Sequence, residues 1–449
     1  MSDLRTWLEA RDGELELQEM TVLLGKRLYP QCPLKPNPKA RCLLPDRRGS
    51  VFTMDDKLFS RHVLIVGAPG VGKTNLINWI LYQIKKSLTP NDVLIIFDTK
   101  GDFYQTFWSP GDVVIANDSR ACGVNGVDYW NIFAEMLVDS RPEDYANEIA
   151  YTLLADKISR TQQPFFPNAA KDLLAALLVF FTRLHEKTGF LATNEHLRLL
   201  ADQASTQVIR NMLSAHVDMR ALVSYISHDE SPQTQGVISE FQQVVRSLFI
   251  GNFAKSGSLS IRKLVRQKGG RTIFVEYDIG YGSLLTPIYV LLIDQAIKEV
   301  LGQSRTEGNV WIVIDEFRLL PRLQYIENAI NLGRGLGLKV ILAMQDINQV
   351  YASYDEKLAK SIIAGCSTLF AYYLTDSNTR EYISAMAGKQ RRLEFYSSNT
   401  LSDPIRDAQE GKVVEDWMLS MLDIGQCFVM PPQAPPFLLE LPEYKHETC

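Results

Sequence analysis

The chain has 449 residues, of which 46% are hydrophobic and 22% are charged, a composition typical of a soluble globular protein. Its 47 Lys and Arg against 52 Asp and Glu give a net charge of −5, which excludes a coat that binds nucleic acid over its whole surface. A small basic channel remains compatible with this charge, because phosphate contacts need only a few well-placed cations.

Three further features of the sequence bear on the compartment. The longest charge-free apolar run covers residues 173–182, shorter than the roughly 18 residues that a membrane span needs. The first residues have neither the basic start nor the apolar core of a signal peptide. The six cysteines and six histidines are scattered without ligand spacing, so no zinc site is expected. We expect a reduced, cytoplasmic protein.

Residues 1–49 are predicted to form an N-terminal arm. Between Lys26 and Arg48 the arm carries seven basic residues and one acid, Asp46, interrupted by several prolines. Such a segment either faces DNA or an acidic membrane surface, or is simply a solvated extended arm.

From residue 61 onward, apolar runs typical of buried parallel strands alternate with helical patterns. Between about 135 and 253 only helical patterns occur. The sequence therefore predicts an α/β protein with a central parallel sheet flanked by helices, into which an all-α domain is inserted. The expected domains are a discontinuous α/β domain at 50–134 and 258–449, and an all-α domain at 135–257. The predicted strands cover residues 62–67, 93–98, 113–117, 272–277, 309–316, 339–345 and 368–374.

The first predicted strand leads into a G-x-x-x-x-G-K-T motif that opens a helix, the context that identifies a P-loop. Its backbone N–H groups are expected to wrap the phosphates of ATP at the positive end of the helix. Lys73 would bridge the β- and γ-phosphates, and the Thr74 hydroxyl would hold Mg²⁺. The predicted nucleotide site consists of Gly67, Ala68, Pro69, Gly70, Val71, Gly72, Lys73, Thr74 and Asn75.

Five apolar residues of a later strand run into Asp315 and Glu316. An acid at a strand end can reach Mg²⁺, so Asp315 is predicted as the second metal ligand. Glu316 is predicted to polarise the attacking water as general base. Together with the P-loop, this acid pair predicts ATP hydrolysis.

Three further sites have two readings each. Arg334, one helix after this acid pair, is either an arginine finger for a neighbouring subunit or a solvated helix residue. Gln345 ends the next strand, where it either senses the γ-phosphate or is an ordinary polar strand end. The third site, Asp98, Lys100 and Asp102 at the end of the second strand, lines the nucleotide or DNA path or only caps a loop.

Taken together, these motifs resemble the coupling ATPases of type IV secretion and conjugation, the TraD/TraG-type group. The resemblance runs in order over residues 58–440, through GAPGVGKT, DTKGDF, WNIF, SIRKLV, VWIVIDEF and NLGRGLGLKVILAMQ. In this family the DTKGDF motif is commonly Asp-Pro-Lys-Gly-Glu, so Thr99 and Asp102 are departures from the pattern.

The resemblance implies a RecA-like motor domain and an all-α domain that assemble as a homo-hexamer around DNA. It implies that Arg334 acts in trans and that Gln345 couples the γ-phosphate to movement. Relaxase and type IV secretion components are implied partners. The family usually carries N-terminal membrane helices, which this sequence does not show, so membrane attachment is expected only through a partner.

Three functions are therefore weighed. The first is an ATP-driven translocase that moves single-stranded DNA or a relaxosome toward a conjugative channel. The second is a soluble HerA-like or FtsK-like DNA pump in repair, segregation or defence. The third is a nucleotide-gated recruitment platform for protein substrates. Lys100, Arg262, Lys263 and the basic arm are the candidate DNA contacts.

Overall fold

The computed structural model describes residues 16–139, 141–302, 304, 307–397 and 405–445. The chain divides into two compact units. The P-loop unit contains residues 1–87, 314–318 and 339–449, and the helical unit contains residues 88–313 and 319–338. The domain boundaries predicted from the sequence divide the chain differently and stay a prediction.

Within the described residues, the largest sheet has the strand order β14-β13-β10-β4-β9-β8-β5-β7-β6. The predicted strands are confirmed, and the sheet is mostly parallel. It departs from the expectation at one edge, where β13 runs antiparallel to β10 and β14 antiparallel to β13. The strands are β4 (Val63–Val66), β5 (Val93–Asp98), β6 (Val113–Ile115), β7 (Arg271–Glu276), β8 (Val310–Ile314), β9 (Leu338–Met344), β10 (Thr368–Ala371), β13 (Gln426–Met430) and β14 (Phe437–Glu440).

The central strands are buried along their whole length, which explains why they read as continuous apolar runs. Every residue of β4, β5, β8 and β9 is buried. Parallel strands are covered on both faces by crossover helices, so both sets of side chains must be apolar.

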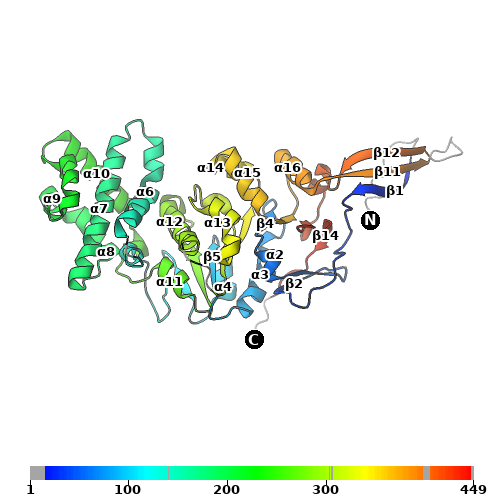
Figure 1. The fold of residues 1–449 in the computed structure, drawn as a ribbon, viewed down its shortest axis with the longest axis horizontal. Coiled ribbons are helices and arrows are strands. Elements are labelled where there is room, and N and C mark those ends of the chain that lie inside the picture. Colours follow the sequence, from blue (N-terminus) through cyan, green and yellow to red (C-terminus); the bar gives the residue numbers. More distant parts are fainter. Residues whose placement is uncertain (1–15, 140, 303, 305–306, 398–404, 446–449) are drawn as a thin grey trace. The chain divides into compact units, whose positions relative to one another are not determined.

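The remaining elements of the P-loop unit are helices on the sheet and two small antiparallel sheets (Figure 1). The first small sheet has the order β1-β11-β12, and the second pairs β2 with β3. These elements are β1 (Glu16–Gly25), β2 (Cys42–Pro45), β3 (Val51–Met54), α2 (Asp56–Phe59), α3 (Lys73–Lys86), α14 (Asn348–Ser353), α15 (Glu356–Gly365), α16 (Ser377–Ala387), β11 (Lys389–Ser397), β12 (Ile405–Lys412) and η5 (Asp416–Ser420).

The part of the predicted arm that the structure describes is not a free extended segment. β1 pairs with β11, and β2 pairs with β3. Two of the basic residues of the arm are also engaged inside the protein, because Arg41 pairs with Asp56 and Arg48 with Asp46. Residues 1–15 of the arm lie outside the described residues.

In the helical unit, all named elements between residues 132 and 267 of the described chain are helical, as predicted, and α6 to α10 gather in one block (Figure 1). α6 and α10 both pack against α7. The helical elements of this unit are α4 (Asp102–Phe107), α5 (Ile132–Met136), α6 (Pro142–Arg160), α7 (Phe165–Thr188), α8 (Asn194–Gln203), α9 (Thr206–Ser214), η1 (Val217–Ile226), α10 (Pro232–Leu248), η2 (Gly251–Ala254), α11 (Ile261–Gln267), α12 (Gly282–Leu301), α13 (Ile326–Leu332) and η4 (Gly333–Leu336); the short η3 (Phe317–Leu319) falls at the division between the units.

Among the described helices, only α7 is long and apolar enough to cross a membrane, judged by length and composition. α7 is longer than the charge-free apolar run at residues 173–182, because the helix extends beyond that run on both sides. Of its most apolar window, 61% is buried inside the protein, and a mostly buried core helix of a soluble protein passes the same test. The packing of α7 against α6 and α10 accounts for its apolar residues.

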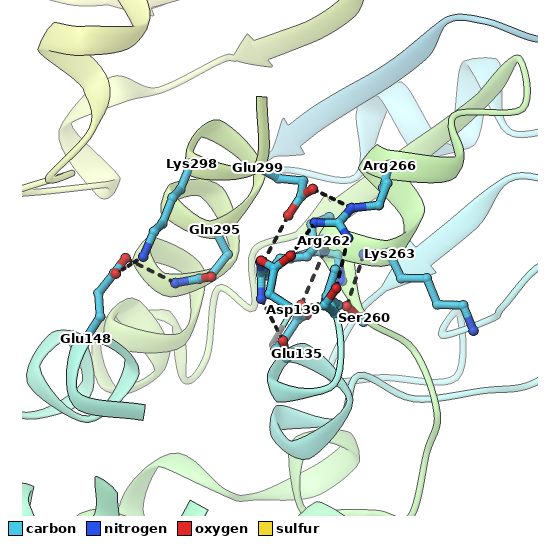
Figure 2. A network of polar contacts seen from close by, with 12 residues as sticks. Glu135, Asp139, Glu148, Ser260, Arg262, Lys263, Arg266, Gln295, Lys298 and Glu299 are labelled. Atoms are coloured by element: carbon cyan, nitrogen blue, oxygen red, sulfur yellow. Dashed lines mark hydrogen bonds and ion pairs between the residues drawn. The ribbon is translucent and has the colours of Figure 1, made fainter. Parts of the chain in front are cut away.

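A buried polar network joins the start of the helical block to α11 and α12 (Figure 2). Arg262 is fully buried; its Nη1 donates to the Glu135 carbonyl at 2.9 Å and its Nε to Glu299 at 3.2 Å. Its Nη2 forms an ion pair with Asp139, and its guanidinium lies 3.8 Å from the ring centroid of Tyr145. The suggestion that Arg262 contacts DNA is therefore wrong, since its guanidinium serves three carbonyl or carboxylate partners inside the protein.

The Glu135 carboxylate completes this network at the start of α11. It accepts from Ser260 Oγ at 2.6 Å, from the Ile261 N–H at 2.7 Å and from Trp130 Nε1 at 2.8 Å. Burial raises the pKa of Glu135, and these hydrogen bonds oppose that shift. The start of α11, which carries adjacent basic residues in the sequence, is thus attached to α5 by buried hydrogen bonds.

The network predicts that Arg262→Met lowers the free energy of unfolding by roughly 3–5 kcal/mol, because the Glu135 carbonyl, Asp139 and Glu299 would all lose the buried guanidinium and Glu299 would keep only the half-exposed Arg266. Denaturant unfolding followed by circular dichroism measures this loss. Lys263→Met is the matched control, since Lys263 is the exposed neighbour on the same helix and its removal should cost less than about 0.5 kcal/mol. Equal effects of the two variants would contradict the role given to the network.

Candidate nucleotide site

The P-loop connects β4 to the N-terminus of α3, as the sequence predicted. Gly72 caps the helix with φ of 111°, a left-handed conformation that favours glycine. Gly67 has no room for a side chain, because a Cβ there would lie 2.6 Å from Cβ of Tyr372. Two of the motif's glycines are therefore required by the backbone of this chain.

Neighbouring segments hold the loop in place. The Gly67 N–H donates to the Met344 carbonyl at 3.2 Å, and the Ala68 N–H donates to the Tyr373 carbonyl at 2.9 Å. The Gly425 N–H donates to the Val71 carbonyl at 3.0 Å. The supporting residues after β10 and before β13 were missed in the sequence, where nothing marks them as neighbours of the P-loop.

The P-loop carries a cation, Lys73, at the N-terminus of α3. Lys73 Nζ donates to the carbonyls of Gly67 at 2.6 Å and Ala68 at 2.9 Å. Lys73 and Thr74 are half-buried, while Pro69 and Gly70 are exposed. The first turn of α3 carries no acidic residue, so no carboxylate of this turn opposes an anion at the positive end of the 14-residue helix.

The acid pair follows β8 directly, with Asp315 buried and the Glu316 side chain 14% exposed. Gln345 Nε2 donates to Glu316 Oε2 at 2.9 Å. The structure thus brings together two residues that the sequence placed at the ends of separate strands. The metal and catalytic roles of these residues stay predictions.

Arg318 was missed by the sequence reasoning. Its Nε lies 3.3 Å from Glu316 Oε1, and its side chain is 47% exposed. Arg318 stands only two positions after Glu316 in the sequence. The turn of η3, which the sequence did not predict, brings the two side chains together.

Two predicted site residues have surroundings that bear on their roles. The Asn75 side chain binds the C-terminal segment, donating to the Pro442 carbonyl at 3.0 Å and accepting from the Tyr444 N–H at 2.7 Å. Only its backbone remains available to a nucleotide.

Arg334 lies in η4 of the helical unit and is exposed.

The DTKGDF segment forms a loop organised by Asp98. This buried carboxylate accepts from four backbone N–H groups at 2.9–3.2 Å, those of Lys100, Gly101, Phe103 and Tyr104. Burial raises the pKa of Asp98 against these hydrogen bonds. Asp98 thus caps this loop, while Lys100 and Asp102 are exposed on it.

A second acid lies opposite Asp98. Glu276 is its register partner at the end of β7. Burial, followed by the charge of Asp98, raises the pKa of Glu276 to about 8, although Arg120 pairs with its carboxylate. A Cβ on Gly101 would lie 2.7 Å from Arg120 Nη1, so the loop also packs closely on this pair. These contacts hold the loop that presents Lys100.

The fold and the site together define a RecA-like P-loop NTPase. The family described as "Type IV secretion-system coupling protein DNA-binding domain" matches residues 49–412, most of the chain. The chain belongs to this family.

Individual relatives agree with this assignment. The type IV secretion system-coupling protein VirD4 of Bartonella quintana (strain Toulouse) is 23% identical over 284 residues, which cover 60% of this chain and 44% of the relative. The chain therefore matches less than half of that curated relative's length.

Solved structures share the fold. The bacterial conjugative coupling protein TrwBdeltaN70, unbound, superposes with a TM-score of 0.74 at 20% identity, covering 96% of this chain and 95% of that one. The plasmid coupling protein TrwB in complex with ADP and Mg²⁺ superposes with a TM-score of 0.69 at 20% identity, covering 97% and 98%.

Proposed function

We propose that this protein is an ATP-driven translocase that moves DNA, or DNA with bound relaxase, toward a type IV secretion channel. The proposal is carried by the placement of Glu316 and Gln345 in hydrogen-bond contact within the P-loop unit of a coupling-protein DNA-binding domain. The ADP and Mg²⁺ in the TrwB complex support ATP and Mg²⁺ as the ligands here.

The chemistry follows from what the P-loop residues can do. ATP would place its phosphates against the N–H groups of residues 67–74, and Lys73 would exchange the Gly67 and Ala68 carbonyls for phosphate oxygens. The Thr74 hydroxyl and the Asp315 carboxylate are hard oxygen donors that fit Mg²⁺, which would neutralise phosphate charge.

Hydrolysis then needs a base and a sensor. Glu316 would take a proton from the attacking water, and Gln345, which contacts it, would report whether the γ-phosphate is present. A chain that moves DNA needs this coupling, because the presence or loss of the γ-phosphate must be passed on to the part that contacts DNA.

Arg334 is proposed to act on the ATP of the neighbouring subunit in a homo-hexamer with DNA in the central pore. Its support is its exposure on η4 and the resemblance to the coupling ATPases. Turnover in mixtures of Arg334→Ala and Lys73→Ala subunits tests this role, since only a shared site regains activity from two inactive parents. A co-assembled mixture without turnover contradicts it.

The proposed location is the cytoplasm, at the inner face of the membrane through partner proteins. The packing of α7 in the helical unit supports this location, since its apolar face is used inside the protein. Type IV secretion components are the proposed partners, as the family description indicates.

One prediction of the proposed function concerns the general base, Glu316. Glu316→Gln should keep ATP affinity but slow hydrolysis by about 10²-fold or more, because only water activation is lost. Lys73→Ala should weaken ATP binding itself, since the phosphates lose their main cation. Fluorescent nucleotide titration and steady-state turnover separate the two effects. Near wild-type turnover of Glu316→Gln would show that another residue is the base.

Another prediction concerns the stimulation of ATP turnover by DNA. Turnover should rise on adding DNA of unrelated sequences alike, because a motor must contact backbone phosphates. Six subunits with one or two cations each would contact on the order of 6–10 phosphates, so stimulation should collapse between about 50 and 200 mM salt. Candidate contacts are the exposed residues Lys26, Arg27, Lys35, Lys39, Lys100 and Lys263.

The measurement is ATP turnover against DNA concentration at several ionic strengths. Lys100→Gln should reduce stimulation, while Lys360→Gln is the control, because Lys360 is a surface lysine already paired with Glu356. If DNA does not raise ATP turnover at low salt although the hexamer is assembled, the translocase proposal is wrong. A recruitment platform for protein substrates is then favoured.

A further inference from the structure

We propose that Arg318 is a positioning residue that restrains Glu316, and that the restraint is released when its guanidinium binds a phosphate group. This inference rests on the proposed function, because it assigns the regulation of the same base. It concerns a side chain outside the P-loop, the acid pair and the predicted finger.

The first observation is that both oxygens of the Glu316 carboxylate are engaged. Oε2 accepts from Gln345 Nε2 at 2.9 Å, and Oε1 lies 3.3 Å from Arg318 Nε. Within the described residues, Oε1 is buried and accepts no hydrogen bond of good geometry, so the ion pair with Arg318 is what compensates it. A general base needs an oxygen directed at water, and here neither one is free.

The second observation is the difference in exposure between the partners. The Glu316 side chain is 14% exposed, whereas that of Arg318 is 47% exposed. The buried Phe317 between them stacks on Tyr354, with ring centroids 5.5 Å apart and planes 8° apart. The backbone is therefore anchored, while the guanidinium can be reached by a ligand from solvent.

The third step is the competition for Arg318. A half-exposed ion pair is weak, because water screens it. A phosphate offers the planar guanidinium two parallel hydrogen bonds, whereas the contact with Glu316 uses Nε alone at long distance. A phosphate near Arg318 would thus take the guanidinium and leave Glu316 Oε1 free to bind the attacking water.

Two phosphates could play this part, one on the nucleotide and one on the DNA backbone. If DNA supplies it, the contact links DNA binding to hydrolysis, since Arg318 cannot hold Glu316 and a DNA phosphate in the same geometry. If the nucleotide supplies it, Arg318 contributes to ATP affinity instead. The two sources differ in kinetics.

The test is steady-state ATP turnover of the full chain as wild type, Arg318→Ala and Arg318→Lys, with and without DNA. If DNA supplies the phosphate, Arg318→Ala should raise kcat without DNA by about two- to five-fold, the range expected for losing one half-exposed ion pair. Arg318→Lys should return kcat toward wild type, because lysine restores the charge. Lys360→Ala is the control, a similarly exposed partner of a surface ion pair in the same unit.

The sources are separated in the same data. With DNA as the source, the ratio of stimulated to basal turnover falls toward one in Arg318→Ala. With the nucleotide as the source, the ratio is unchanged and KM for ATP rises. The double variant Arg318→Ala with Glu316→Gln should lose the added turnover, which shows that it passes through Glu316.

The outcomes are distinguishable from failure of the proposed function. A wild type that turns over ATP while Arg318→Ala has neither a raised basal kcat nor a raised KM for ATP overturns the restraint alone. A wild type that hydrolyses no ATP overturns the proposed function and the restraint together.

Discussion

The nucleotide site depends on the parallel pairing of β4 with β9, in which Val66 lies opposite Met344. Because parallel strands end at the same edge of a sheet, this register places Gly67 beside Gln345, one residue beyond each partner. The hydrogen bond from the Gly67 N–H to the Met344 carbonyl joins the two segments directly. A slip of one residue would turn the Gln345 side chain away from Glu316 and separate the sensor from the base.

The same unit shows which groups of the site already have partners inside the protein. Lys73 is occupied by carbonyls of its own loop, and Glu316 by Gln345 and Arg318. Lys73 and Arg318 are cations that phosphate would bind more strongly than their present partners, so arrival of phosphate would exchange these internal contacts for ligand contacts. Activation would then need only side-chain exchange at fixed strand ends.

The fold could largely be predicted from the sequence where the signal is local. Strands such as β5 and β8 are continuous apolar runs because both faces are buried, and the P-loop motif lies between a strand and a helix. Partners distant in sequence could not be predicted. β1 pairs with β11, which begins at residue 389, and Arg262 is buried only because three acids from α5, the following loop and α12 surround it. Arg318 and Glu316 are only two residues apart in the sequence, yet their contact depends on the turn of η3, which the sequence did not predict.

The central claim is that ATP hydrolysis at this strand edge moves DNA. The most direct measurement is displacement of a labelled third strand from a DNA triplex by the assembled protein. The account predicts displacement that requires hydrolysable ATP and is absent with Glu316→Gln. A protein that binds DNA and hydrolyses ATP, yet leaves the third strand in place at every ATP concentration, would contradict the claim.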